Sequence, residues 1–273
     1  MNDLAPAPIE FVEAAGARLA VTRRGRGEPV LCLHAIGHGA RDFSALAARL
    51  GDRFEFIAVD WPGHGQSPGE SCGVSIERYG EIAVALLDSI GLDQAVLLGN
   101  SIGGAAALQC AAAAGERVRA LVLCNAGGLQ AVDLLARLYC RHMANFFATG
   151  ERGDKRFARR FRRYYERVVL PMQAARARRE EIIASAYAVA PLLRQAWQSF
   201  ATSGSDLRSL APKIVCPVLF AWAKRDLAVN WGRSKHAALS VHNRLVAIFD
   251  AGHAAFLEQP DAFDEAFVRF VGA

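Results

Sequence analysis

The chain has 273 residues, of which 52% are hydrophobic and 22% are charged, and its formal net charge is +5. This composition excludes a disordered or fibrous protein, and the length predicts one large domain with room for an insertion. Six cysteines are scattered without a C-x-x-C pair, so we expect neither a metal cluster nor a disulfide framework. This cysteine usage, and first residues that do not read as a basic and apolar leader, predict a cytoplasmic location.

Short apolar runs alternate with helical periodicity over most of the chain, which is typical of a mostly parallel sheet with helices on both faces. The predicted strands are Ile9–Ala14, Arg18–Thr22, Pro29–His34, Phe54–Val59, Ala95–Leu98, Ala120–Cys124, Ile214–Trp222 and Arg244–Phe249. The predicted helices begin at Phe43, after the N-cap Ser75 and at Gly104, and a last one contains Phe263 and Phe267. The sequence therefore predicts an α/β fold that opens with a β-hairpin.

The alternation breaks between Leu129 and Leu210, where helical periodicity continues without a convincing strand. We expect residues 1–128 and 211–273 to form the α/β core, and residues 129–210 to form a helical insertion. Within the insertion, Glu151–Glu180 contains eleven Arg or Lys and four Asp or Glu, a local charge of +7. The basic character therefore belongs to this segment rather than to the whole chain.

The uncharged stretch Ala95–Gly115 contains the first candidate catalytic residue. A strand, the turn GNSIG and a small-residue helix give the strand–turn–helix context of a G-x-S-x-G nucleophile elbow around Ser101. A serine on so sharp a turn has a strained backbone, and the flanking glycines avoid collisions with neighbouring backbone. A membrane span is the alternative for a stretch this long, but its four glycines, Asn100 and Gln109 argue against that. A serine that only caps the helix stays open until partners are found.

A histidine and a carboxylate follow later predicted strands in the order that an elbow serine requires. Asp226 comes shortly after the strand that ends at Trp222, and His253 comes just after the last strand. Open α/β sheets place their sites at such carboxyl ends of strands. Each residue alone reads more simply as a loop residue, but their joint occurrence in the order Ser–Asp–His predicts a catalytic triad. Asp250 is a poorer candidate for the acid, because it lies too close to His253 on an extended segment.

Attack by Ser101 would place negative charge on a carbonyl oxygen, so two preorganised N–H donors are expected nearby. One is the amide of Ile102, directly after the serine. The other is the amide of Ile36, in the glycine-rich loop after Pro29–His34. We expect His34 itself to orient this loop.

Several segments together resemble the α/β-hydrolase superfamily over nearly the whole chain. They are HAIG at 34–37, DWPGHGQS at 60–67, the elbow at Ser101, WAKRD at 222–226, and GH at 252–253 followed by EQP at 258–260. The resemblance implies Ser101 as nucleophile, Asp226 as acid, His253 as base, and the Ile36 and Ile102 amides as the oxyanion hole. It also implies that the insertion 129–210 is a helical cap. We expect no cofactor and no metal.

Within that superfamily, the sequence GNSIGG and the loop after His34 look like the meta-cleavage-product hydrolases, which cleave carbon–carbon bonds. Three positions depart from that pattern. Ala254 stands where those enzymes usually carry tryptophan, and Ala35 and Ala223 replace glycines. A serine elbow, in contrast, argues against the haloalkane dehalogenase and epoxide hydrolase branches.

Two classes of function remain open from the sequence. The first is a serine hydrolase acting on a small-molecule ester, thioester, lactone or carbon–carbon bond, and the second is a ligand-binding module that has lost turnover. We expect no nucleic-acid or membrane partner, and a homodimer stays open. The basic segment is either a solvated surface or a source of inward arginines for an acidic substrate. The candidates for such an inward residue are Arg156, Arg159, Arg160, Arg162, Arg163 and Arg167.

Overall fold

A computed structural model describes residues 8–272 and contains one eight-stranded sheet in the order β1-β2-β4-β3-β5-β6-β7-β8. All pairs from β4 to β8 are parallel, whereas β1 and β2 form an antiparallel hairpin that joins β4 at one end. The strands are β1 (Ile9–Ala14), β2 (Ala17–Gly25), β3 (Glu28–Leu33), β4 (Phe54–Val59), β5 (Ala95–Asn100), β6 (Val118–Cys124), β7 (Val218–Ala223) and β8 (Arg244–Phe249). The predicted α/β fold with a mostly parallel sheet is confirmed.

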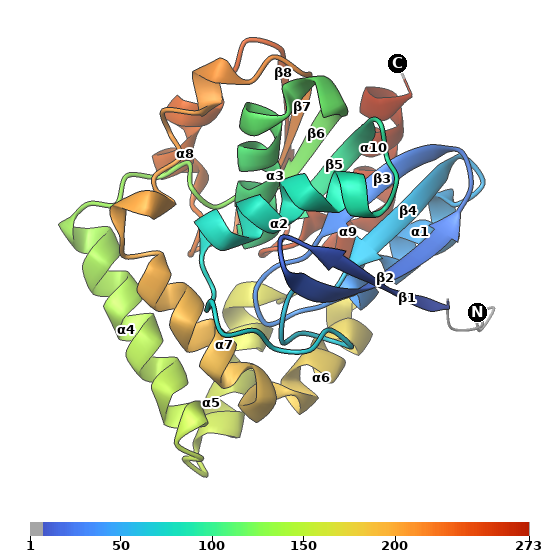
Figure 1. The fold of residues 1–273 in the computed structure, drawn as a ribbon. Coiled ribbons are helices and arrows are strands. Elements are labelled where there is room, and N and C mark those ends of the chain that lie inside the picture. The colour runs from blue at the N-terminus through green and yellow to red at the C-terminus, as the bar shows by residue number, and fades with distance from the viewer. Residues whose placement is uncertain (1–7, 273) are drawn as a thin grey trace.

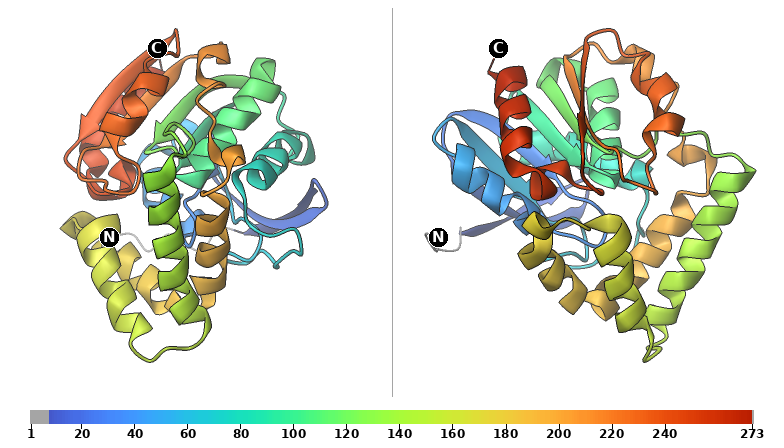
Figure 2. Two further views of the ribbon diagram at one scale, coloured as in Figure 1. Left: turned by 90° about the vertical axis from the view of Figure 1, so that its left-hand side faces the viewer. Right: turned by 180° about the vertical axis from the view of Figure 1, so that it is seen from behind.

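Helices cover both faces of this sheet (Figures 1 and 2). On one face lie α2 (Ile76–Ser89) and α3 (Ile102–Ala113), and on the other lie α1 (Ser44–Leu50) and α10 (Pro260–Val271). Every residue of the central strand β5 is buried, because helices pack on both of its sides. Two shorter helices, α8 (Trp231–Ala238) and α9 (Ala255–Glu258), complete this part of the molecule.

The helical insertion lies between β6 and β7, and the described chain has no strand there. It contains α4 (Leu134–Glu151), α5 (Phe157–Tyr164), α6 (Arg176–Ala184) and α7 (Ala186–Ser199), and α4 packs along α7. Figure 1 shows these helices gathered at one end of the sheet, below its strands. Residues from α4 and α7 line the same cavity as Ser101, so the insertion covers the carboxyl ends of the strands.

Two local features differ from the sequence-based expectations. The short helix α8 was not predicted, because its eight residues lie among polar turns and show little apolar periodicity. At the end of α5 the chain widens into a π-helix at Tyr165–Val169. Such widened turns are rare and often occur at functional sites, and no simple sequence pattern marks them.

Candidate active site

The nucleophile elbow has the geometry that its glycine spacing predicts. Ser101 stands between β5 and α3 with φ 57° and ψ −118°, a left-handed conformation that non-glycine residues rarely adopt. A Cβ atom on Gly99 would lie 2.5 Å from the carbonyl oxygen of Gly103, and one on Gly103 would collide with the backbone of Leu33. Close packing of the turn against neighbouring backbone therefore requires both glycines, and it holds the serine in its strained position.

Asp226, in the turn after β7, forms a short hydrogen bond with His253. Its Oδ2 lies 2.6 Å from His253 Nδ1 and accepts a second bond of 2.7 Å from the side-chain amide of Asn125. Its Oδ1 accepts the backbone N–H groups of Ala228 and Val229 at 2.8 and 3.0 Å. Burial alone would raise the pKa of this carboxyl, but His253 and the backbone amides hold the pKa below its ordinary value. Asp226 is therefore an ionised, fully hydrogen-bonded partner for the imidazole.

His253, in the loop after β8, is fixed by its backbone as well as by its ring. Its N–H donates to Val169 O at 2.7 Å, and its carbonyl accepts a bond of 2.9 Å from Asn100 Nδ2. Burial would lower the pKa of this imidazole, but the Asp226 carboxylate raises the pKa above its ordinary value. Since Asp226 takes the hydrogen on Nδ1, the neutral ring has Nε2 free to accept a proton.

Ser101, Asp226 and His253 all line one cavity. Among the described residues, no hydrogen bond joins Ser101 Oγ to the histidine ring. Catalytic bonds of this kind are often long in a free enzyme and shorten when substrate binds. The structure therefore brings the three predicted residues to one site and pairs two of them directly.

The two predicted oxyanion amides also border this cavity. Ile102 is the first residue of α3, so its N–H has no carbonyl acceptor within the helix, and the N–H of Ile36 makes no bond within residues 8–272. Free donors beside a nucleophile at a helix N-terminus can stabilise developing negative charge.

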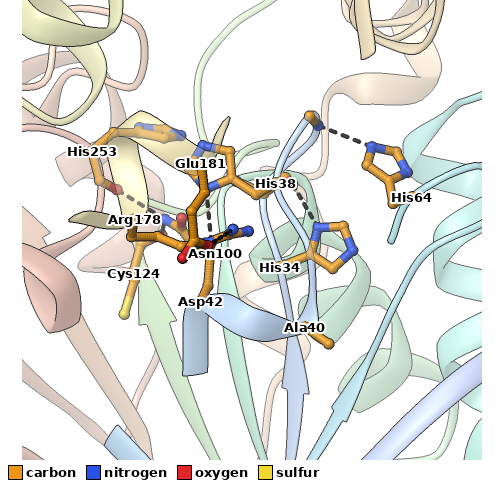
Figure 3. A network of polar contacts seen from close by, with 12 residues as sticks. His34, His38, Ala40, Asp42, His64, Asn100, Cys124, Arg178, Glu181 and His253 are labelled. Carbon is orange, nitrogen blue, oxygen red and sulfur yellow. Dashed lines mark hydrogen bonds and ion pairs between the residues drawn. The ribbon is translucent and has the colours of Figure 1, made fainter. Parts of the chain in front are cut away.

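Two buried histidines hold the loop that carries Ile36. His34 Nε2 accepts the backbone N–H of Trp61 at 3.0 Å. His64 Nε2 accepts the N–H of Gly37 at 3.0 Å, the bond drawn at the His64 ring in Figure 3. Burial lowers the pKa of His34 to about 4 and that of His64 to about 3, so both rings stay neutral acceptors at neutral pH. His34 has the orienting position that the sequence predicted.

The cavity has a volume of about 320 Å³ and a mostly apolar wall. Side chains from the insertion supply much of that wall, namely Tyr139, Tyr164, Tyr165, Trp197 and Phe200. The rings of Tyr164 and Tyr165 pack on each other, and so do those of Trp197 and Phe200. These side chains also line the cavity, which a pattern of apolar spacing cannot reveal.

Three further polar residues, which the sequence does not single out, support the site. Asn125, at φ 42°, donates to Asp226 and accepts the N–H of Ala223. Asn100, next to the nucleophile, donates to the carbonyl of His253. Glu258 is buried and accepts the N–H of Gly252 at 2.6 Å. Only the position of Asn100 beside Ser101 could have signalled a role.

None of the six candidate inward arginines of the insertion lines the cavity. Five of them are exposed, and Arg162 forms ion pairs with Glu166 and Glu180 at the surface. The hypothesis that one of them faces the substrate is wrong, because the charged faces of these helices point to solvent. The arginine that does border the cavity, Arg233, already bonds to Asp133 at 2.7 Å.

Within residues 8–272, no helix is long and apolar enough to cross a membrane. The same residues contain no group of three or more potential ligands that could hold a metal ion. Asp250 forms exposed ion pairs with Arg225 and Lys224, away from the site, as expected.

The sheet order, the elbow and the helical insertion define an α/β-hydrolase fold. The profile of the alpha/beta hydrolase family matches residues 30–266, and the chain belongs to this family. A pimeloyl-[acyl-carrier protein] methyl ester esterase from Xanthomonas oryzae is 30% identical over 91% of this chain and 97% of its own. An uncharacterised protein of Mycobacterium tuberculosis is 32% identical, but the match spans 50% of this chain and 41% of that protein.

Solved structures agree on the fold. An esterase from Exiguobacterium antarcticum has a TM-score of 0.82 and 20% identity, with 96% of this chain and 99% of that chain covered. A meta-cleavage product hydrolase from Pseudomonas fluorescens has a TM-score of 0.75 and 19% identity, with 96% and 97% covered. The chain is thus an α/β-hydrolase family member whose fold is similar to those of an esterase and a meta-cleavage product hydrolase.

Proposed function

We propose that this protein is a serine hydrolase that cleaves a small-molecule carboxylic ester or a related acyl bond. The observation that carries the proposal is the strained Ser101 facing the same cavity as the His253–Asp226 pair, whose two side chains lie 2.6 Å apart. In this role Ser101 is the nucleophile, His253 the base, and Asp226 the acid that orients the base. A small molecule is then the only partner that the reaction needs besides water.

In the proposed reaction, His253 Nε2 takes the proton of Ser101 as Oγ attacks the carbonyl carbon. Asp226 stabilises the imidazolium that forms and stays ionised throughout. The amides of Ile36 and Ile102 stabilise the oxyanion, each contributing on the order of 3 kcal/mol. The imidazolium then protonates the departing alcohol, and water hydrolyses the acyl-enzyme by the same steps.

The apolar cavity supports a substrate whose acyl group is largely hydrocarbon. The full-length relative whose name describes a methyl ester esterase also favours an ester over other bonds. We further propose that residues 129–210 act as a cap, since helices from this segment supply the aromatic wall over the site. We no longer expect the substrate to carry an acidic group, because the six arginines that suggested such a group lie outside the cavity.

A second candidate reaction is carbon–carbon bond hydrolysis of the meta-cleavage-product type. Asn100 beside Ser101 and the similarity to a meta-cleavage product hydrolase favour it. Against it stands Ala254, which leaves the position after His253 without the tryptophan that the resemblance leads one to expect. A ligand-binding role without turnover is a third candidate, and a complete set of catalytic groups disfavours it.

A substrate panel separates these candidates. Short-chain methyl esters and carboxylated dienones are offered to the purified protein, and product acids are quantified by mass spectrometry. We expect ester hydrolysis at a higher kcat/KM than dienone cleavage. Faster cleavage of the dienones would favour the second candidate. Binding of substrates without any product would favour the ligand-binding role and overturn the proposed hydrolase.

A further inference from the structure

A second buried histidine–carboxylate pair borders the cavity. His38, in the loop after β3, has Nδ1 2.7 Å from Asp42 Oδ2, and the two side chains are 1% and 0% exposed. Asp42 Oδ1 in turn accepts a bond of 2.7 Å from Nε of Arg178 on α6 (Figure 3). The ring orientation of His38 is therefore fixed from the core and from the helical insertion together.

The charged groups around this pair are two guanidinium groups and two carboxylates. Arg178 and Arg41 both bond to Glu181, at 2.8 and 3.1 Å, so two guanidinium groups face two carboxylates. Burial would raise the pKa of Asp42, but His38 and Arg178 hold the pKa well below its ordinary value. Because Asp42 is an ionised acceptor, the ring hydrogen lies on Nδ1 of His38. The other ring nitrogen, Nε2, then presents a lone pair.

This lone pair has no partner among the described residues. His38 lines the cavity, and within residues 8–272 no hydrogen bond to its Nε2 occurs. The ring of Tyr165 packs against it with centroids 5.7 Å apart, so the imidazole has little room to turn. An acceptor of fixed direction that opens onto the cavity matches a ligand that brings a hydrogen-bond donor.

The enclosed position of His38 indicates whether it contacts the acyl group or the alcohol group of an ester. Leu135 and Leu227 border the cavity and are 69% and 68% exposed, so they mark its mouth, whereas the His38 side chain is almost fully enclosed. During ester hydrolysis the alcohol must leave before water enters, while the acyl group stays attached to Ser101. The group that stays is the one suited to the enclosed part of the cavity.

We propose that His38 is a specificity residue whose Nε2 accepts a hydrogen bond from a hydroxyl or amide N–H group on the acyl chain of the substrate. The inference rests on the proposed ester hydrolysis and narrows its substrate class to acyl groups that carry a hydrogen-bond donor. Apolar walls around a single directed acceptor would select the position of that donor along the chain.

The test uses matched methyl esters. Straight-chain esters with a hydroxyl on the third to the sixth carbon are each paired with the methoxy analogue, and acetamido esters are paired with their N-methylated forms. We expect the wild type to prefer one donor-bearing ester by about 10- to 100-fold in kcat/KM. Comparison of the hydroxy and acetamido series identifies whether a hydroxyl or an amide N–H group donates to His38. The His38→Leu variant should lower this ratio to about one.

Ratios within a pair cancel any general loss of activity, so a partly impaired variant still reports on recognition. His142→Leu, on the exposed face of α4, is the matched control and should keep the wild-type ratio. If His38→Leu does not fold, His38→Met removes the same acceptor. A wild-type ratio near one for every pair, or a preference that survives loss of His38, would overturn the proposal.

Asp42→Asn provides a second and more specific readout. Arg178 cannot give up its proton, so the asparagine oxygen must face Arg178 and the amide N–H₂ must face His38 Nδ1. The ring hydrogen then moves to Nε2, and the acceptor becomes a donor. We expect this variant to lose the hydroxyl preference and to gain activity, relative to the hydroxy ester, on the oxo analogue. If Asp42 had a purely structural role, the variant would lower kcat/KM for all esters by the same factor. That result would contradict the proposed change of tautomer.

Plain unsubstituted esters separate this inference from the proposed function. If they are not hydrolysed at all, the proposed hydrolase fails. If they are hydrolysed but no donor-bearing ester is preferred, the role of His38 alone fails.

Discussion

At the scale of single residues, the site requires the carboxylate of Asp226 and does not use that of Asp250. Asp226 and Asp250 both precede His253 within a short span, yet only Asp226 touches its ring. Asp226→Asn should lower kcat by about 10⁴-fold, because the wrong imidazole tautomer would be favoured. Asp250→Asn, the matched control at an exposed ion pair, should stay near wild type. Steady-state kinetics on one ester measures both, and the reverse ranking would show that the acid is misassigned.

The pH dependence of the reaction follows from the same pair. Asp226 raises the pKa of His253 above its ordinary value of about 6.5, and a protonated ring cannot accept the serine proton. Lowering the pH through this raised pKa should therefore reduce kcat/KM, by about tenfold for each further pH unit. We expect the midpoint above 6.5 in the wild type and in Asp250→Asn. A midpoint clearly below 6.5 would mean that the carboxylate does not stabilise the imidazolium.

At the scale of the elements, the elbow between β5 and α3 holds Ser101 in a strained conformation that close backbone packing maintains. Gly99→Ala should destabilise the protein by about 2–3 kcal/mol, since its Cβ would press on backbone that cannot move aside. Gly69→Ala is the control, because a Cβ there meets nothing within 4 Å and needs no unusual φ. Urea unfolding monitored by tryptophan fluorescence compares the two. Equal stability of both variants would show that the turn tolerates a side chain.

The helical insertion makes a second prediction at this scale. Five of the six candidate arginines around α5 are exposed, and Arg162 lies in surface ion pairs, so solvent and salt screen their charge. A carboxylate-terminated ester and its methylated form should therefore give kcat/KM values within about threefold of each other at low salt. A strong preference for the carboxylate that Arg163→Gln removes would restore the idea of an inward charge.

At the scale of the whole molecule, the sequence was informative wherever a pattern is local. Strands β4 and β8 match their predicted bounds, and Ser75 caps α2 as expected, because apolar runs and capping are short-range features. The order and strand context of Ser101, Asp226 and His253 likewise predicted residues that line one cavity.

What the sequence could not predict depends on contacts between distant segments. Asn125 supports Asp226 from the turn after β6, and Arg178 reaches Asp42 from the insertion, 136 residues away. The direction in which each arginine of α5 points also depends on how that helix packs. The periodicity of a helix identifies which of its faces is buried but not which element packs against that face. It therefore predicted neither the aromatic wall of the cavity nor the exposure of these arginines.

The most direct test of the central claim is covalent labelling of the nucleophile. A fluorophosphonate is added to the wild type and to Ser101→Ala, and the modified residue is located by peptide mass spectrometry, with ester turnover measured in parallel. We predict one adduct, on Ser101, and a loss of turnover of roughly 10⁴-fold or more in Ser101→Ala. An adduct on a different residue, or ester hydrolysis that survives in Ser101→Ala, would contradict the account.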